Sequence, residues 1–177
     1  IIIQTGKLDH FKSPDLLAEA AVNCLNNNLN IYIKFVGGGP REMIKKIHSI
    51  FLESGYADKY EVTGFKNSKM LADEFSSSHL SVYPGGTSLS ALESAAVGCP
   101  VLMNNLPASK EKNKKGIGFM FENLSTDDLT LKINKAYSDR SFLKTLSKKG
   151  FESVVKYFSY QKISTELINY IYKDIGG

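Results

Sequence analysis

The sequence has 177 residues, of which 42% are hydrophobic and 23% are charged, the proportions of one soluble globular domain. A chain of this length buries roughly 70% of its unfolded surface, so it needs neither disulfides nor a structural metal. The 22 Lys and Arg residues against 18 Asp and Glu give a net charge of +4, which suits a small anionic ligand and falls well short of a nucleic-acid-binding surface. The longest apolar stretch, 95–103, is far shorter than the roughly 20 residues that a membrane span requires.

The first residues and the cysteines indicate the setting of the chain. It opens with three isoleucines and lacks a Met, a charged segment and a cleavage pattern, which predicts a strand cut from a longer protein and not a signal peptide. Cys24 and Cys99 are isolated and have no CxxC spacing, so we expect reduced core thiols and a cytoplasmic protein. The three histidines lie far apart in the sequence, without metal-ligand spacing, and we expect no metal site.

Short apolar runs alternate with segments of helical periodicity along the chain. The predicted strands are Ile1–Thr5, Ile31–Val36, Tyr60–Thr63, Leu80–Tyr83, Pro100–Met103 and Ile117–Phe121. The predicted helices are Asp15–Leu25, Arg41–Leu52, Ser68–Ser76, Ser88–Val97, Thr126–Tyr137, Ser141–Tyr157 and Tyr160–Tyr172. This alternation predicts one α/β domain, a Rossmann-like doubly wound parallel sheet of about six strands with helices on both faces and a helical C-terminal tail.

Two local patterns complete this reading. Ser125 and Ser159 stand where the N-caps of the last helices are expected. The lysine-rich stretch Ser109–Lys115 is interpreted as a solvated loop, and contact with anionic lipid headgroups is the alternative.

In a doubly wound fold, ligands bind beyond the carboxyl ends of the strands, so the loops at those ends are the candidate site. After the first strand, Gly6 and the two cations Lys7 and Lys12 suit a phosphate, while two solvated loop lysines are the alternative. After the second, 37–40 reads Gly-Gly-Gly-Pro and allows close backbone approach. A dinucleotide fingerprint would need Gly at position 42, which is Glu42, so binding of NAD is the less favoured function.

The other two loops carry an aromatic residue and a glycine-rich turn. Gly64 and Phe65 follow the third strand, where backbone groups can meet a base edge, although core packing of Phe65 is the alternative. The fourth loop, 83–89, has two glycines before a helix start, an arrangement that favours an anion. Glu93, one turn later, could accept hydroxyl hydrogens from a ribose, or it could close a capping box with Ser90.

Taken together, these loops resemble a known family over nearly the whole chain. The family motifs G-R-L-D-x-x-K-G, V-G-x-G-P, V-x-F-x-G and P-S-x-x-E-G-F-G-x-x-x-L-E-A-M-A-x-G-x-P-V have counterparts at Gly6–Lys12, Val36–Pro40, Val62–Phe65 and Leu92–Val101. In this order and spacing they resemble the carboxyl-terminal half of retaining GT-B glycosyltransferases, the glycosyl transferases group 1 family. The resemblance implies that residues 1–177 form the donor-binding half of a GT-B fold, without the acceptor-binding amino-terminal half.

The resemblance also implies a role for individual residues. It places the donor diphosphate at Gly6, Lys7, Lys12, Thr87, Ser88 and Leu89. It places the ribose at Glu93, the base at Gly39, Gly64 and Phe65, and the donor sugar at Gly85 and Gly86. Gly85 stands where the family has the first carboxylate of its E-x7-E motif, Lys7 where it has Arg, and Ser13 where it has Gly.

The function implied by the resemblance is retaining transfer from a nucleotide sugar, most simply a UDP-sugar, without a metal or other cofactor. The acceptor would be a polysaccharide or lipid-linked saccharide of bacterial O-antigen or capsule synthesis, bound through the amino-terminal half at the cytoplasmic face of the inner membrane. This half alone is expected to be inactive. A non-catalytic nucleotide-binding module remains an alternative because one motif carboxylate is missing, and no nucleic-acid partner is expected.

Overall fold

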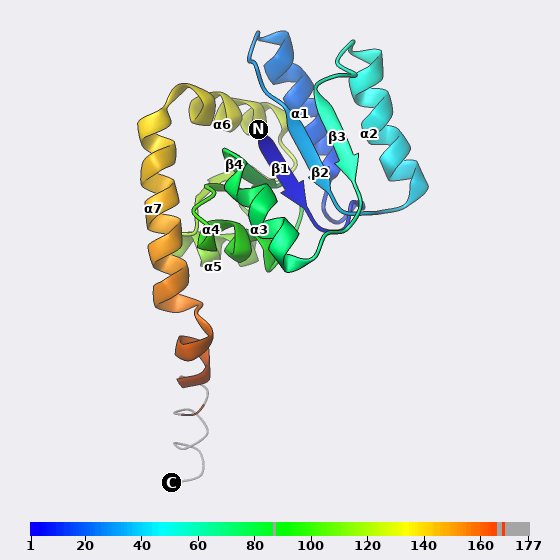
Figure 1. Cartoon of the computed structure of the whole chain (residues 1–177). Coiled ribbons are helices and arrows are strands. Elements are labelled where there is room, and N and C mark those ends of the chain that lie inside the picture. Colours follow the sequence, from blue (N-terminus) through cyan, green and yellow to red (C-terminus); the bar gives the residue numbers. More distant parts are fainter. Residues whose placement is uncertain (87, 166–167, 169–177) are drawn as a thin grey trace.

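The computed structural model describes residues 1–86, 88–165 and 168. Within this part of the chain, six parallel strands form one sheet in the order β3-β2-β1-β4-β5-β6 (Figure 1). The strands are β1 (Ile2–Thr5), β2 (Ile33–Val36), β3 (Tyr60–Thr63), β4 (Leu80–Tyr83), β5 (Val101–Asn104) and β6 (Phe119–Phe121). The predicted doubly wound fold is therefore confirmed, and its strand order reverses between β1 and β4, which is where such sheets bind ligands.

The helices follow the predicted order with small changes at their ends. They are α1 (Pro14–Asn26), α2 (Arg41–Glu53), α3 (Ser68–Ser76), α4 (Ser90–Ala96), α5 (Pro107–Lys114), α6 (Thr126–Ser138) and α7 (Arg140–Tyr157). Ser125 caps α6 as predicted, because its Oγ accepts from the Asp128 N–H at 3.1 Å. Residues 160–165 are helical behind Ser159, whose Oγ accepts from the Lys162 N–H at 3.4 Å. Most of the remainder of the predicted helix Tyr160–Tyr172 lies outside the described residues.

The prediction of a loop over Ser109–Lys115 is wrong, since α5 covers residues 109–114 and Lys115 is its C-cap. Pro107 occupies the first turn, where its fixed φ favours a helix and its missing N–H costs nothing. The following Lys and Glu residues are good helix formers. The helix is also anchored to the sheet, because the buried Ser109 Oγ donates to Asn104 Oδ1 at 2.7 Å. This charge-rich stretch therefore forms a helix that one buried hydroxyl, that of Ser109, links to the end of β5.

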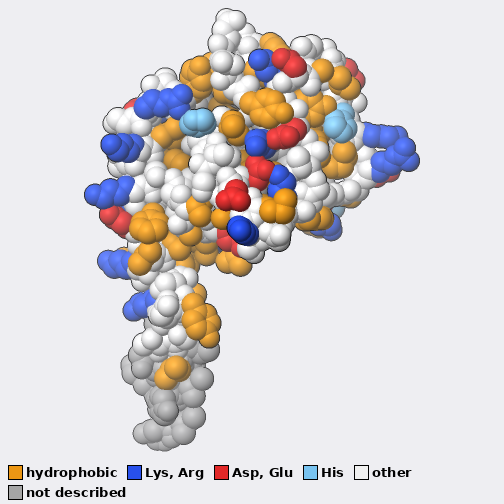
Figure 2. Space-filling view, in the orientation of Figure 1, with side chains coloured by type: hydrophobic (Ala, Val, Ile, Leu, Met, Phe, Trp, Pro, Cys, Tyr) orange, Lys and Arg blue, Asp and Glu red, His pale blue; other side chains and the backbone are white. Residues whose placement is uncertain are grey.

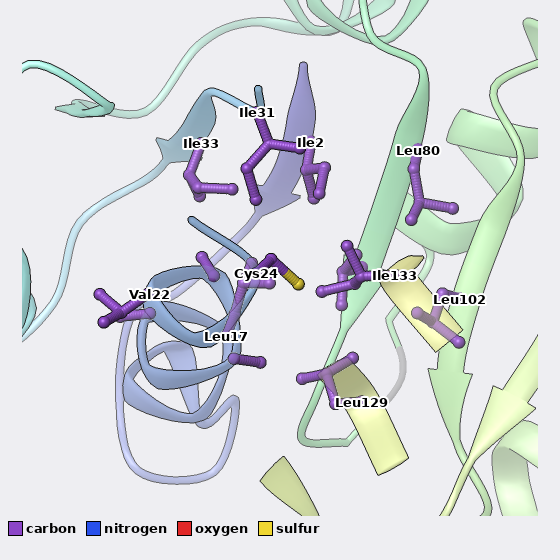
Figure 3. Close-up of a cluster of buried hydrophobic side chains, with 14 of the residues drawn as sticks. Ile2, Leu17, Val22, Cys24, Ile31, Ile33, Leu80, Leu102, Leu129 and Ile133 are labelled. Carbon is purple, nitrogen blue, oxygen red and sulfur yellow. The ribbon is translucent and has the colours of Figure 1, made fainter. Parts of the chain in front are cut away.

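Alternate residues of the strands pack against helices on opposite faces of the sheet. On one face, Ile2 joins a cluster with α1, α2 and α6, in which the Cys24 side chain points toward Ile133 (Figure 3). On the other face, Ile3 packs with Phe75 and Cys99. Both thiols are buried as predicted, and burial raises the pKa of Cys24 to about 12. In the described ranges, no helix has the length and apolarity to cross a bilayer.

Glu74 on α3 ties the loop after β3 to strand β2. Its carboxylate accepts from Lys34 Nζ at 2.8 Å and from Lys66 Nζ, and its side chain is 15% exposed. The hydrogen bonds from Lys34 and then from Lys66 hold the pKa of the Glu74 carboxyl below its ordinary value of 4.5. A lowered carboxyl pKa stabilises the fold above the ordinary value, and this contribution is lost as the pH falls through the native value.

We therefore expect Glu74→Gln to lower the free energy of unfolding at pH 7 by about 1.5–3 kcal/mol, the contribution of hydrogen bonds to a charged group. The difference from wild type should begin to shrink below pH 4.5 and should be lost once the pH has fallen through the lowered native pKa of Glu74, where both side chains are neutral. Urea unfolding across this pH range measures the effect. Glu53→Gln, which changes an exposed carboxylate, is the control and should be nearly neutral. A deficit of Glu74→Gln that stays constant into acid would contradict the ionic role.

Candidate functional site

Three loops meet main chain to main chain at the carboxyl end of the sheet, where ligands bind in such folds, and we use the name crevice for this junction of residues 6–13, 37–40 and 84–86. The loop after β1 lies between the loop after β2 and the loop after β4. On one side, the Leu8 N–H donates to Gly38 O at 2.9 Å. On the other side, Gly85 N donates to Lys12 O at 3.1 Å and Gly86 N to Phe11 O at 2.9 Å. The shape of the crevice is thus fixed by backbone hydrogen bonds between loops that are distant in sequence.

Two of these loops approach the loop after β1 so closely that only glycine fits at the contact. A Cβ on Gly39 would lie 1.8 Å from Leu8 O, and a Cβ on Gly85 would lie 2.0 Å from Phe11 O. Both distances are far below contact with a backbone atom that cannot move alone. In contrast, a Cβ on Gly64 would meet nothing within 4 Å.

We expect Gly39→Ala to destabilise the protein by about 1–3 kcal/mol, since overpacking forces backbone shifts of this cost. Gly64→Ala is the matched control and should change the free energy of unfolding by no more than about 0.5 kcal/mol. Urea unfolding of the two variants measures the difference. Equal stability of both would show that the close approach of Gly39 to Leu8 does not constrain the fold.

Lys12 crosses from the loop after β1 to the loop after β4. Its Nζ donates to Gly86 O at 2.6 Å, and its carbonyl accepts from the Gln4 side-chain amide at 3.0 Å. The ammonium is thereby held at the junction of the two loops. Lys7 is placed differently: its side chain is 68% exposed and its Nζ lies 3.3 Å from Asp9 Oδ2. The structure brings Lys12, and not Lys7, into contact with the glycines before α4.

The buried carboxylate of Asp9 braces the turn that carries both lysines. Its Oδ1 accepts from the N–H groups of Phe11 and Lys12 at 3.1 and 3.2 Å. Ser13 follows with a φ of 46°, in the left-handed region, and it does not cap α1 with its side chain. The difference between Ser13 and the Gly of the family motif therefore falls at a position where glycine is the least strained residue.

Glu93 stands in the first turn of α4 without the capping role that its sequence context allows. The helix begins at Ser90 with Leu89 at the N-cap, and no side chain caps it. Glu93 is half-buried, and among the described residues its carboxylate has no hydrogen bond or ion pair. The capping box is not formed, which leaves the carboxylate available for a ligand.

Among the described residues, three buried polar atoms near the carboxyl end of the sheet have no hydrogen-bond partner, namely Gln4 Oε1, Thr63 Oγ1 and Ser88 Oγ. They come from β1, from the end of β3 and from the loop before α4. A buried polar atom without a hydrogen bond costs about 1–3 kcal/mol, so each is a candidate for contact with a bound molecule. Leu89 is 68% exposed, and Thr87 lies outside the described residues.

Phe65 is not in the core, the alternative that its aromatic side chain left open. It is 73% exposed, and its ring lies over Gly38, where an added Cβ would come 3.0 Å from Phe65 Cε2. A flat, exposed ring thus borders the glycine loop after β2, close in sequence to Gly39. Such a ring can stack on a base.

Two residues of the site were not found by sequence reasoning. The fully buried Asn104 at the end of β5 donates to Pro84 O at 2.9 Å and to Gly85 O, and its Oδ1 accepts from the Leu106 N–H at 3.2 Å as well as from Ser109. It ties the loop before α4 to the start of α5. The signal was a carboxamide ending an otherwise apolar strand.

The other residue is Lys112 on α5. Burial and, after it, the nearby Lys12 ammonium lower the pKa of Lys112. The two lysines come from helix α5 and from the loop after β1, so the fold adds a further cation to the same end of the sheet. The sequence could not indicate this, because the segment was interpreted as a loop.

A metal centre is not built by the side chains that the structure describes, since among them no group of three or more His, Cys, Asp or Glu could hold an ion. The sheet order, the glycine loops and the position of the crevice define one Rossmann-like half of a GT-B fold. The chain belongs to the glycosyl transferases group 1 family, whose model matches residues 1–153.

Solved structures share this fold at low sequence identity. The C-terminal domain of the glycosyl transferase group 1 protein LpcC from Francisella tularensis has a TM-score of 0.80 and 18% identity, covering 90% of this chain and 86% of that one. HepE from Anabaena, in complex with UDP, has a TM-score of 0.87 and 15% identity over 97% of this chain and 48% of that one. A mutant of TarM from S. aureus, in complex with fondaparinux, α-GlcNAc-glycerol and UDP, has a TM-score of 0.82 and 18% identity over 95% and 34%.

The chain therefore spans about half the length of HepE and about a third of TarM. No curated protein sequence matches it significantly.

Proposed function

We propose that this domain binds the nucleotide-sugar donor of a retaining glycosyltransferase, most simply a UDP-sugar. The observation that carries the proposal is the Lys12 ammonium held 2.6 Å from Gly86 O, where the loops after β1 and β4 meet. The carboxylate of Glu93, which has no partner among the described residues, comes from the first turn of α4, and the exposed ring of Phe65 comes from the loop after β3. A nucleoside diphosphate needs a cation for its diphosphate, a hydrogen-bond acceptor for its ribose hydroxyls and a flat surface for its base, and these three residues supply them.

The proposed roles follow the placement of each residue. Lys12, assisted by Lys7, neutralises the diphosphate, and the backbone N–H groups of Ser88 and Leu89 donate to its distal phosphate. Glu93 accepts from the ribose hydroxyls. The base lies against Phe65 and the backbone at Gly39 and Gly64, and the donor sugar faces Gly85 and Gly86. Ammonium groups stabilise the charge of the leaving diphosphate in this scheme, so we propose transfer without a metal ion.

The acceptor belongs to the rest of the proposal. We infer a saccharide or lipid-linked saccharide held by an amino-terminal half, in the synthesis of a bacterial surface polysaccharide such as O-antigen or capsule, at the cytoplasmic face of the membrane. Family membership supports a glycosyl acceptor. The UDP present in the HepE and TarM complexes supports the choice of nucleotide.

Calorimetric titration of the domain with UDP in EDTA tests the central claim. We expect UDP to bind without a divalent ion and more tightly than uridine, because charge-assisted hydrogen bonds to the phosphates are worth about 1.5–3 kcal/mol each. Binding that appears only after magnesium or manganese is added would overturn the metal-free proposal. Absence of sugar transfer by a full-length protein that binds UDP would favour a non-catalytic nucleotide-binding module, for which the missing carboxylate at Gly85 is the argument.

A further inference from the structure

We propose that a groove between the end of α5 and helix α7 binds a phosphate-bearing anion. The groove has a volume of about 300 Å³ and is lined by Lys114, Lys115, Lys149 and Lys156 together with Glu152 and Tyr157. None of these residues belongs to the crevice, and the proposal does not depend on a donor nucleotide. Lys and Arg side chains follow the edge of the molecule that α7 forms, with few acidic ones among them (Figure 2).

The charges of the groove are unbalanced. Four ammonium groups line it against one carboxylate among the described residues. Glu152 is close to Lys148, with 3.9 Å between Oε1 and Nζ, and Lys114 is paired with Glu111 at 2.7 Å. Lys115, Lys149 and Lys156 have no ion pair in the part of the chain that the structure describes. Three such cations around one hollow repel one another, and a bound anion removes that repulsion.

Two of the three lysines also lie over aromatic rings. The Tyr157 ring contacts both, because Lys115 Nζ lies 5.7 Å and Lys156 Nζ 5.0 Å from its centroid. Lys115 Nζ is also 5.1 Å from the centroid of the Phe158 ring. Cations over aromatic faces at these distances are attracted to them. The Tyr157 ring therefore favours positions of Lys115 and Lys156 that place both ammonium groups at the groove.

Glycine permits the approach of the third lysine. The Lys149 side chain passes over Gly116, where an added Cβ would come 2.9 Å from Lys149 Cε and 2.7 Å from the buried Ser153 Oγ. Gly116 has a φ of 90°, a left-handed conformation that glycine adopts without strain. The turn after α5 thus brings Lys115 and Lys149 to the same hollow.

Lysine ammonium groups bind phosphate as point charges and need no fixed geometry. A phosphate or diphosphate is of a size that the groove admits. Two sources carry this chemistry, a soluble phosphorylated molecule and the headgroups of an anionic lipid surface. The same cations would recognise either, so the experiment has one arm for each.

In the first arm, the whole chain is floated with vesicles of phosphatidylcholine that contain phosphatidylglycerol, and with pure phosphatidylcholine as reference. In the second arm, inorganic pyrophosphate is titrated into both double variants in a Lys12→Ala background, which removes the ammonium proposed to hold a diphosphate in the crevice and leaves the groove open. The groove variant combines Lys149→Gln and Lys156→Gln. The control variant combines Lys45→Gln and Lys69→Gln, two exposed residues of α2 and α3, and removes the same charge. Equal melting temperatures of the two double variants confirm that both are folded.

We expect the affinity of the groove variant to fall about 30-fold in one of the two arms. Each lysine beside an anionic surface raises the affinity by roughly a factor of five, and the variant removes two. The control pair should lose much less. Loss in the vesicle arm identifies a lipid headgroup, and loss in the pyrophosphate arm identifies a soluble ligand. Tyr157→Leu, which keeps every charge, should weaken the same arm by a smaller factor. Binding in neither arm, or equal losses in the groove and control pairs, would overturn the proposal.

Discussion

Replacing Lys12 by Ala should raise the dissociation constant for UDP by roughly ten- to hundredfold, the effect of losing one charge-assisted hydrogen bond of about 1.5–3 kcal/mol. The ammonium lies at the junction of the loops after β1 and β4, so it is the cation that the structure ties most closely to the crevice. Lys7 should contribute less, because its side chain is 68% exposed and lies beside Asp9. Calorimetry on both alanine variants compares the two.

Uridine is the necessary control, since Lys12 also holds Gly86 O and its loss could loosen the loop. A role toward phosphate predicts a large loss for UDP and a small loss for uridine. A role limited to the loop predicts similar losses for both ligands, and that result would remove Lys12 from the proposed diphosphate site.

Glu93→Gln should weaken UDP and uridine alike, by about 1.5–3 kcal/mol or ten- to hundredfold, because both ligands carry the ribose. Gln keeps the size of the side chain and loses the charge that makes a carboxylate a strong acceptor. The unfolding transition should move little, since α4 has no side-chain cap and the carboxylate has no partner among the described residues.

A comparison of affinity and stability separates the alternatives. If Glu93→Gln binds UDP as tightly as wild type while Glu93→Ala unfolds at a lower temperature, the side chain is structural and the ribose assignment is wrong. The opposite result, in which Glu93→Gln loses affinity for UDP and keeps its stability, supports the ribose assignment. Deoxyuridine diphosphate, which lacks a ribose hydroxyl, should be less sensitive to the substitution than UDP.

The regular part of the fold could be predicted because its signals are local. Ser68–Ser76 was located to the residue, and Ser125 was predicted as a cap from its place before an amphipathic segment. Helix α5 was missed because its composition is that of a solvated segment. Its helix is fixed by Ser109 bonding to Asn104 across the fold, a tertiary contact that periodicity does not report.

The candidate site divides in the same way. The loops were predicted from glycines and lysines at strand ends, whose meeting place follows from the topology of parallel sheets. The choice between the two roles of Glu93 depended on whether the N-cap is Leu89 or Ser90, a difference of one residue at an irregular turn. Helix boundaries at that precision are set by tertiary structure. Asn104 and Lys112 reach the site from β5 and α5 by tertiary contacts, and neither stands in one of the four family motifs.

Backbone groups form the walls of the crevice, so substitutions of the side chains that project into it can change which ligand binds while the fold is kept. The backbone at Leu8, Lys12, Gly38 and Gly85 sets the outline through hydrogen bonds between peptide groups, which do not depend on the identity of exposed side chains. In the proposed donor site, the side chains that project from this frame are the ones that can vary with the sugar or base. A test of donor preference by mutation is therefore best directed at Phe65 and Ser88, with the glycines left unchanged.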